Sequence, residues 1–230
     1  MKRVGFTTTI PVEILLAAER VPVDLNNIFI TSKSPLSYIE FAEDEGLPRN
    51  TCSWIKGIYA TVIKNSIDEV IGVVEGDCSN THALMELFRD KKISVIPFAF
   101  PYGESDKYDY LKKQMEKLLN HYGIGWEELE KVIVRVDRVR EKLVFLDELT
   151  VQGYVSGFEN HLWLVSSTDF NSDIDNFEKE DNIAEVVQRI ETIDPEDEEN
   201  KIISWNLKLG DFAKLGDYLQ ELVGSENEDN

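Results

Sequence analysis

One segment, Glu69-Val-Ile-Gly-Val-Val-Glu75, constrains the fold of this chain more than any other. It is a near-continuous apolar, β-branched run that lies between Asp68 and Gly76. Such a run is typical of a parallel strand buried on both faces, because a strand with one face in water alternates apolar and polar residues. The sequence therefore predicts a strand at the centre of a parallel sheet.

The segments around this strand alternate between strand and helix patterns. Further strands are predicted at residues 4–9, 27–30 and 93–100. Helices are predicted at residues 12–20 and 36–45, from about Cys52 onward, and through 83–88 with Ser79 or Asn80 as the cap. This alternation implies an α/β fold, a Rossmann-like parallel sheet with helices on both faces.

A helical C-terminal region is expected to follow the sheet. Helices are predicted at 108–121, 126–149, 156–167 and 173–190, although β-branched residues 132–136 leave a strand open as an alternative. Pro195 and the acidic run 196–199 indicate a boundary, with a short strand, a helix and a polar tail after it. The expected domains are a Rossmann-like domain at 1–105, a helical region packed on it at 106–193, and a C-terminal segment at 194–230.

The charge of the chain limits its partners. Asp and Glu total 44 against 24 Lys and Arg, which gives a formal net charge of −20. A field of that sign repels phosphate backbones and anionic membrane surfaces, so we expect neither nucleic acid nor a membrane as a partner. The N-terminus reaches Pro11 without an apolar signal run, and no stretch approaches a membrane-spanning length, so a cytoplasmic location is expected.

Cys52 and Cys78 are the only cysteines, and each stands at the predicted start of a helix. In a reducing compartment they are better interpreted as metal ligands, redox groups or core residues than as a disulfide. Backbone N–H groups at a helix N-terminus favour thiolate over thiol, and in open α/β sheets such loops meet at one edge. Their separation of 26 residues matches no short zinc or ferredoxin signature, and free cysteine is often simply buried.

Three segments resemble the D-component family of 2-hydroxyacyl-CoA dehydratases, which includes benzoyl-CoA reductase subunits and double-cubane cluster proteins. Residues 4–19, beginning Val-Gly-Phe-Thr-Thr-Thr-Ile-Pro, are similar to the family's opening strand and helix. Leu47-Pro-Arg-Asn-Thr-Cys52 with Lys56-Gly57 resembles its first cysteine loop, and Val73-Val-Glu-Gly-Asp-Cys-Ser-Asn-Thr81 resembles its second. The similarity is strongest over residues 4–101 and weaker through Phe177.

This resemblance implies a Rossmann-like domain, a [4Fe-4S] cluster with Cys52 and Cys78 as metal ligands, and oxygen-sensitive chemistry on an acyl-CoA. It also implies an electron supply from a separate ATP-dependent activator. Full family subunits have a second α/β domain with a further cysteine, which we do not expect to be complete here. A four-iron cluster normally takes four ligands, so a homodimer, a partner chain or an open iron position would complete the site.

Several residues near the cysteines are candidates for lesser roles. Arg49 is a candidate for offsetting cluster charge or binding a coenzyme A phosphate, with a surface ion pair as the equal alternative. Trp54 is a candidate for shielding a cluster, and His82 for a hydrogen bond to it, against ordinary packing and surface positions. Asp77 is expected to cap a helix, and no catalytic residue is assigned. A non-catalytic binding or assembly subunit that has lost the cluster is the alternative function.

Overall fold

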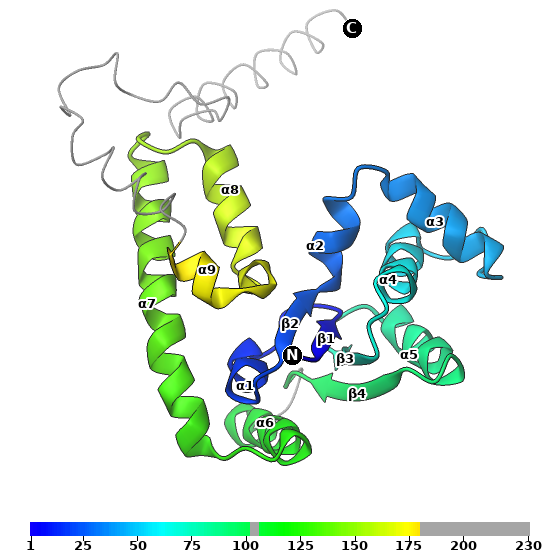
Figure 1. Ribbon diagram of the computed structural model, residues 1–230, viewed down its shortest axis with the longest axis horizontal. Coiled ribbons are helices and arrows are strands. Elements are labelled where there is room, and N and C mark those ends of the chain that lie inside the picture. The colour runs from blue at the N-terminus through cyan, green and yellow to red at the C-terminus, as the bar shows by residue number, and fades with distance from the viewer. Residues whose placement is uncertain (102–105, 180–230) are drawn as a thin grey trace, which may run out of the picture. The chain divides into compact units, whose positions relative to one another are not determined.

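The computed structural model of the chain describes residues 1–101 and 106–179 (Figure 1). Its centre is a four-stranded parallel sheet with the order β2-β1-β3-β4. The strands are β1 (Arg3–Phe6), β2 (Val21–Asp24), β3 (Glu69–Glu75) and β4 (Ser94–Ala99). The predicted α/β class with a parallel sheet is confirmed, and β3 lies in the interior of the sheet between β1 and β4.

Burial of β3 explains why its sequence is so continuously apolar. Val70, Ile71 and Val73 are all fully buried although successive side chains point to opposite faces of the sheet. Both faces are therefore covered. Figure 1 shows α1 (Val12–Ala17) and α6 (Lys107–Tyr122) on one face, and α4 (Ser53–Lys64) and α5 (Asn80–Asp90) on the other.

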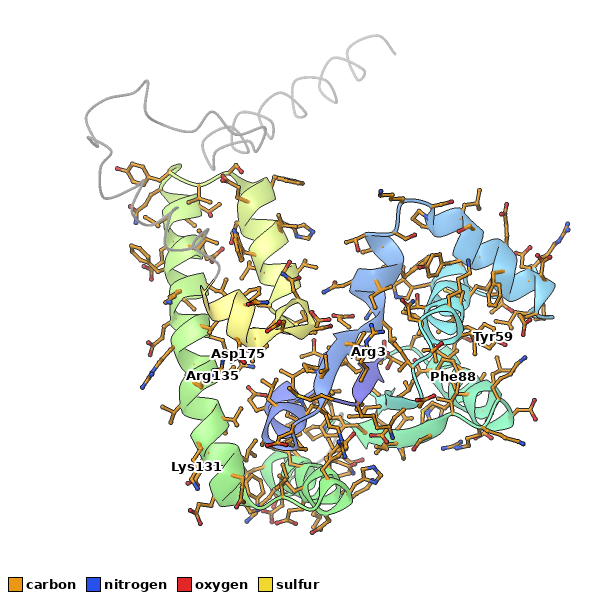
Figure 2. All side chains as sticks on the ribbon, in the orientation of Figure 1. Arg3, Tyr59, Phe88, Lys131, Arg135 and Asp175 are labelled. Carbon is orange, nitrogen blue, oxygen red and sulfur yellow. The ribbon has the colours of Figure 1, made fainter. Side chains whose placement is uncertain are left out.

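The core beneath α4 and α5 is anchored by two aromatic rings. Tyr59 and Phe88 stack with their ring centroids 6.1 Å apart and an interplanar angle of 4°, and each is at most 1% exposed (Figure 2). Tyr59 belongs to α4, whose apolar stripe faces the sheet. Helix α3 (Pro35–Asp44) packs against α4. Tyr59 is therefore a core residue.

The predicted strand at 27–30 is wrong, because these residues belong to helix α2 (Leu25–Ile30). Asp24 caps this helix: its Oδ1 accepts hydrogen bonds from the backbone N–H groups of Asn26 and Asn27 at 2.9 and 3.4 Å. A carboxylate cap satisfies donors that would otherwise lack partners, and here it outweighs the β preference of the isoleucines. The strand of this region, β2, lies earlier in the chain and ends at Asp24. Pro22 is tolerated within it because β2 is an edge strand.

The helical region after β4 is confirmed as far as the structure describes it. It contains α6, α7 (Trp126–Val151), α8 (Gly157–Ser166), a 3-10 turn η1 (Phe170–Ser172) and α9 (Ile174–Lys179). The alternative strand at 132–136 is wrong, since these residues are inside α7. Gly123, with a φ of 70°, ends α6 in the left-handed conformation that glycine adopts without strain.

The chain separates into two compact units. The first contains Met1–Asp137 together with Ser166–Phe177, and Arg135 and Asp175 form an ion pair within it (Figure 2). The second contains Arg138–Val165, where Asn160 donates a hydrogen bond to Asp147 at 2.8 Å and joins α8 to α7. The domain limits expected at 105 and 193 stay predictions, and the segment 194–230, with its acidic run, strand and helix, lies outside the described residues. None of the helices in the described part of the chain is long and apolar enough to cross a membrane.

Candidate functional site

The strand order creates a crevice between β1 and β3. From β1 the chain crosses to β2 on one side, and from β3 it crosses to β4 on the other. The loops after these two neighbouring strands diverge, and ligands of open α/β sheets bind at such a switch point outside the carboxyl ends of the strands. Both loops belong to the first compact unit.

A cavity of about 300 Å³ lies at this switch point. Its base is apolar, with Ile55, Ile58 and Leu84 all buried. The other lining residues are polar or amphipathic, and they come from the loop after β1, α2, α4, the loop after β3 and the start of α5: Thr7, Thr8, Asn26, Trp54, Asp77, Cys78 and Thr81. An apolar base with a polar rim is the usual form of a small-ligand site.

Both cysteines lie at this edge of the sheet. Cys52 is the residue at the N-cap of α4, and Cys78 follows β3 and directly precedes Ser79, the N-cap of α5. Both thiols are exposed and neither is in a disulfide, so neither cysteine fills the core. Cys78 lines the cavity, and Cys52 stands two residues before Trp54, which also lines it.

Hydrogen-bond donors of the protein lie near both thiols. Helices α4 and α5 both begin at this edge, and the N-terminus of a helix presents unpaired N–H groups with partial positive charge. The Asn80 side-chain amide also donates a hydrogen bond to Sγ of Cys78 at 3.4 Å.

Lys56 binds the backbone of the first cysteine loop, residues 47–52, from the helix that follows it. Its side chain is 2% exposed, and its Nζ donates to Oε1 of Glu43 at 2.6 Å and to the backbone carbonyl oxygen of Arg49 at 2.8 Å. A buried ammonium group needs such partners because burial without them is costly. Sequence reasoning assigned Lys56 no role. The signal was a lysine inside the apolar run of α4.

Arg49 is on the surface in this structure. Its side chain is 93% exposed, and its Nε lies 3.7 Å from Oε2 of Glu43. This is the geometry of the surface ion pair, and it leaves the guanidinium accessible to an anion. Binding of a cofactor by Arg49 therefore stays a prediction.

Trp54 forms one wall of the cavity. Its indole is 43% exposed, it meets the Phe29 ring edge-on at 5.4 Å, and its Nε1 donates a hydrogen bond to Oδ1 of Asn26 at 2.7 Å. Sequence analysis missed Asn26. The pattern Asp24-Leu-Asn-Asn27, which is typical of a helix cap, was the signal that could have placed it near this edge.

His82 and the neighbouring carboxylates are engaged with the protein. Nε2 of His82 lies 3.0 Å from the carbonyl oxygen of Val74, and it is the donor because a carbonyl only accepts. Glu75 accepts a hydrogen bond from the Tyr110 hydroxyl at 3.0 Å, and Asp77 accepts one from the Thr81 hydroxyl at 3.3 Å. Asp77 therefore binds the first turn of α5 through a side chain.

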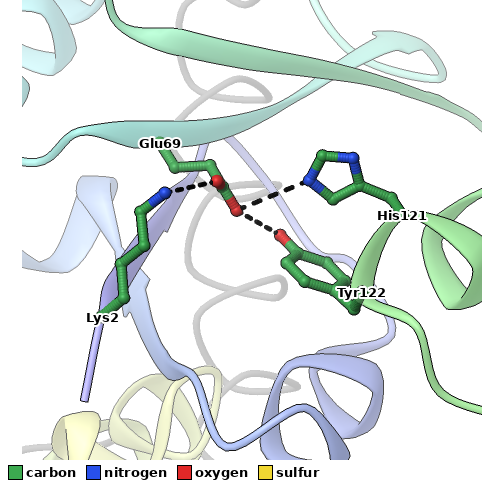
Figure 3. Close-up of polar contacts among 4 residues, drawn as sticks. All are labelled: Lys2, Glu69, His121 and Tyr122. Carbon is green, nitrogen blue, oxygen red and sulfur yellow. Dashed lines mark hydrogen bonds and ion pairs between the residues drawn. The ribbon is translucent and has the colours of Figure 1, made fainter.

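A second polar cluster lies at the opposite edge of the sheet (Figure 3). Glu69, which is 5% exposed, accepts hydrogen bonds from Lys2 at 2.7 Å and from the Tyr122 hydroxyl at 2.8 Å, with His121 at 4.0 Å. Burial alone would raise the pKa of Glu69, but the hydrogen bonds from Lys2 and Tyr122 and the nearby positive charges hold it below its ordinary value. Burial also raises the pKa of Tyr122, and the hydrogen bond to Glu69 raises it further. These contacts join the N-terminus and α6 to β3, and they are structural.

The profile of the family described as 2-hydroxyglutaryl-CoA dehydratase, D-component, matches residues 7–224. The chain belongs to this family. The match continues well beyond residues 4–101, where the resemblance of the sequence is strongest, and its range includes Cys52 and Cys78. No curated protein matches the chain at significant similarity.

Within the described residues, no group of three or more histidine, cysteine, aspartate or glutamate side chains could hold a metal ion. The described part of this D-component chain therefore adds no third residue of these types beside Cys52 and Cys78, and their role as metal ligands stays a prediction.

Proposed function

We propose that this chain is a dehydratase-type subunit that contributes Cys52 and Cys78 to a [4Fe-4S] cluster, in low-potential electron transfer or reductive dehydration of an acyl-CoA. The observation that carries the proposal is that both thiols are free and exposed on helix starts at one edge of the sheet, where Cys78 lines a cavity and Cys52 stands two residues before Trp54, which also lines it. Membership of the dehydratase family supports this class of chemistry.

The residues fit a cluster that is shared between chains. Thiolate sulfur is the usual ligand of iron–sulfur clusters, and four ligands are the norm. Two exposed thiols fit half of such a set, and their exposure leaves them accessible to a second copy of the chain in a symmetric dimer or to a partner subunit. A cluster held by the two thiols of one copy alone would leave two iron positions open.

The cluster, when bound, would supply one-electron reduction at low potential. The chain's own residues would bind and shield it. Ile55, Ile58 and Leu84 would exclude water from its protein side, and Trp54 would cover one flank, which tunes a cluster's potential. Arg49, exposed beside the first loop, would bind an anionic group such as a phosphate of coenzyme A, while His82 would order the second loop through Val74.

The partners follow from the same proposal. A D-component is by its name one component of a larger system, and the electron would come from an ATP-dependent activator protein. Reduced thiols and an oxygen-sensitive cluster suit the cytoplasm of a cell living without oxygen. The alternative is a non-catalytic binding or assembly subunit that has lost the cluster.

Iron and acid-labile sulfide content tests the proposal. The protein is purified without oxygen, alone and with reconstitution, and its mass in solution is measured together with its visible spectrum. We expect about four irons per two copies, with loss of iron in both Cys52→Ala and Cys78→Ala.

Ser53→Ala and Ser79→Ala are the matched controls, since each changes an exposed neighbour of one cysteine, and Ser79 makes no capping hydrogen bond through its side chain. Both should keep their iron. Absence of iron from the wild-type protein after anaerobic reconstitution, alone and with a candidate partner subunit, would leave the assembly subunit as the function.

A further inference from the structure

A chain of hydrogen bonds connects the cavity to a segment more than a hundred residues away in the sequence. Oδ2 of Asp169 accepts from the backbone N–H of Asp24 at 2.8 Å, and Oδ1 of Asp24 accepts from both the backbone N–H and Nδ2 of Asn26 at 2.9 Å. Nδ2 of Asn26 also donates to the Thr7 carbonyl oxygen at 2.9 Å. Oδ1 of the same amide accepts from Trp54 Nε1, at the wall of the cavity.

Thr168 forms a hydrogen bond with the second carboxylate oxygen of Asp24, Oδ2. Its hydroxyl donates to Oδ2 of Asp24 at 2.7 Å and accepts from Nδ2 of Asn27 at 3.0 Å. Both oxygens of the Asp24 carboxylate are thus engaged, one by its own helix cap and one by the 166–177 segment. All of these residues belong to the first compact unit.

Burial makes these bonds depend on one another. Asp24 and Asp169 are 6% and 5% exposed, so loss of one donor leaves a carboxylate with a poorly satisfied charge away from water. Trp54, in contrast, is 43% exposed. Its orientation rests on the Asn26 hydrogen bond and the edge contact with Phe29.

We propose that Asn26 is a positioning residue for this site, and that docking of Thr168 and Asp169 on Asp24 sets where Asn26 holds the Trp54 indole. The proposal rests on the proposed function only in taking this cavity as the site. Thr168 and Asp169 do not line the cavity, so they act on it through Asp24 and Asn26.

The arrangement makes the cavity wall responsive to protons. Burial raises the pKa of Asp169 to about 6; the hydrogen bond from the Asp24 N–H opposes this shift, while the charge of Asp24 adds to it. Asp24 is the charged group that faces Asp169 from β2, and Asp77 is the other carboxylate that lines the cavity near Trp54. Deprotonation of Asp169 places a second negative charge beside the Asp24 carboxylate, and this repulsion weakens the docking of the segment that contains Thr168 and Asp169. Asn26, which is hydrogen-bonded to both Asp24 and Trp54, then shifts the position of the Trp54 indole.

Fluorescence of Trp54 in the metal-free full-length protein tests the coupling. The chain has four tryptophans, so the Trp54 signal is taken as the difference between each variant and the same variant carrying Trp54→Phe. Thr168→Val removes the hydroxyl at nearly constant volume, whereas the matched control Thr168→Ser keeps it. We expect Thr168→Val to move Trp54 emission to longer wavelength and raise its quenching by acrylamide, Asn26→Ala to do the same, and Thr168→Ser to leave both unchanged.

A pH titration gives the second readout. Trp54 emission of the wild-type protein should change with a midpoint near pH 6, and the change should be absent in Asp169→Asn but retained in His82→Gln. An unchanged Trp54 signal in Thr168→Val, in a protein that unfolds cooperatively in urea, overturns the proposal. A transition that persists in Asp169→Asn also overturns it.

The two proposals fail separately. The Trp54 measurement needs no iron, so a protein that never binds a cluster can still show the coupling. A protein with its full iron content and an unresponsive Trp54 would retain the proposed function and lose the positioning role of Asn26.

Discussion

Lys56 donates a hydrogen bond from Nζ to the backbone carbonyl oxygen of Arg49, 2.8 Å away, from a side chain that is buried in α4. The bond ties the start of the first cysteine loop to the helix that follows it. With Glu43 as its second partner, Lys56 fixes the position from which Cys52 is presented.

Replacing this lysine should loosen the loop. We expect Lys56→Met to lower the free energy of unfolding by about 1–3 kcal/mol, because the Arg49 carbonyl and Glu43 lose a charged donor. Alkylation of Cys52 should speed up while that of Cys78 does not, as measured by mass spectrometry. Lys33→Met, at an exposed lysine, is the control and should change neither quantity. Equal alkylation rates for Cys52 in the wild type and in Lys56→Met would show that Lys56 does not hold the first cysteine loop in place.

Gly57 is required by the close approach of α4 to α2. A Cβ at this position would overlap the Phe29 ring, although alanine usually favours a helix. We expect Gly57→Ala to destabilise the protein by about 1–3 kcal/mol in urea unfolding, which is the usual cost of overpacking. In a Phe29→Leu background the cost of the same substitution should fall, and a full cost there would show that the ring is not the cause.

Glu69 should make stability depend on pH in acid. Its pKa is lower in the folded protein than its ordinary value of 4.5, so the unfolded chain binds the proton more tightly. The stability that Glu69 contributes is present above that ordinary value and is lost as the pH falls through the lowered one. We expect Glu69→Gln to cost about 1–3 kcal/mol at neutral pH, from the weakened bonds to Lys2 and Tyr122, and much less in acid. Asp68→Asn, at the exposed neighbour, should show no such convergence in urea unfolding.

Asp169 should make stability depend on pH in the direction opposite to Glu69. Its pKa is raised from 3.8 to about 6, so the folded protein holds the proton more tightly. The associated stability is complete below the ordinary value and is lost as the pH rises through about 6. We expect Asp169→Asn, which keeps an acceptor for the Asp24 N–H, to stabilise the protein by about 1–3 kcal/mol at neutral pH. Asp173→Asn, at an exposed carboxylate of the same segment, is the control, and a gain in that variant as large as in Asp169→Asn would contradict the assignment.

Local sequence pattern alone was enough for the elements that have a strong one. The apolar run of β3, the amphipathic helices α4 and α6, and the glycine break at Gly123 were all predicted, because periodicity and backbone preference act over a few residues. The two cysteines were placed at helix starts for the same reason. The alternation of strands and helices predicted a parallel sheet. Because all strands of such a sheet end on the same side, both cysteines were expected at one edge.

Only the tertiary structure decided the order of the strands and the partners of the buried polar groups. Residues 27–30 were assigned to a strand because their β-branched residues are a local signal, while the cap that makes them helical depends on the conformation of Asp24. The bonds from Asp169 to Asp24 and from Asn26 to Trp54 join residues 145 and 28 positions apart. No local pattern encodes such pairs, because each exists only after the sheet has brought its two segments together.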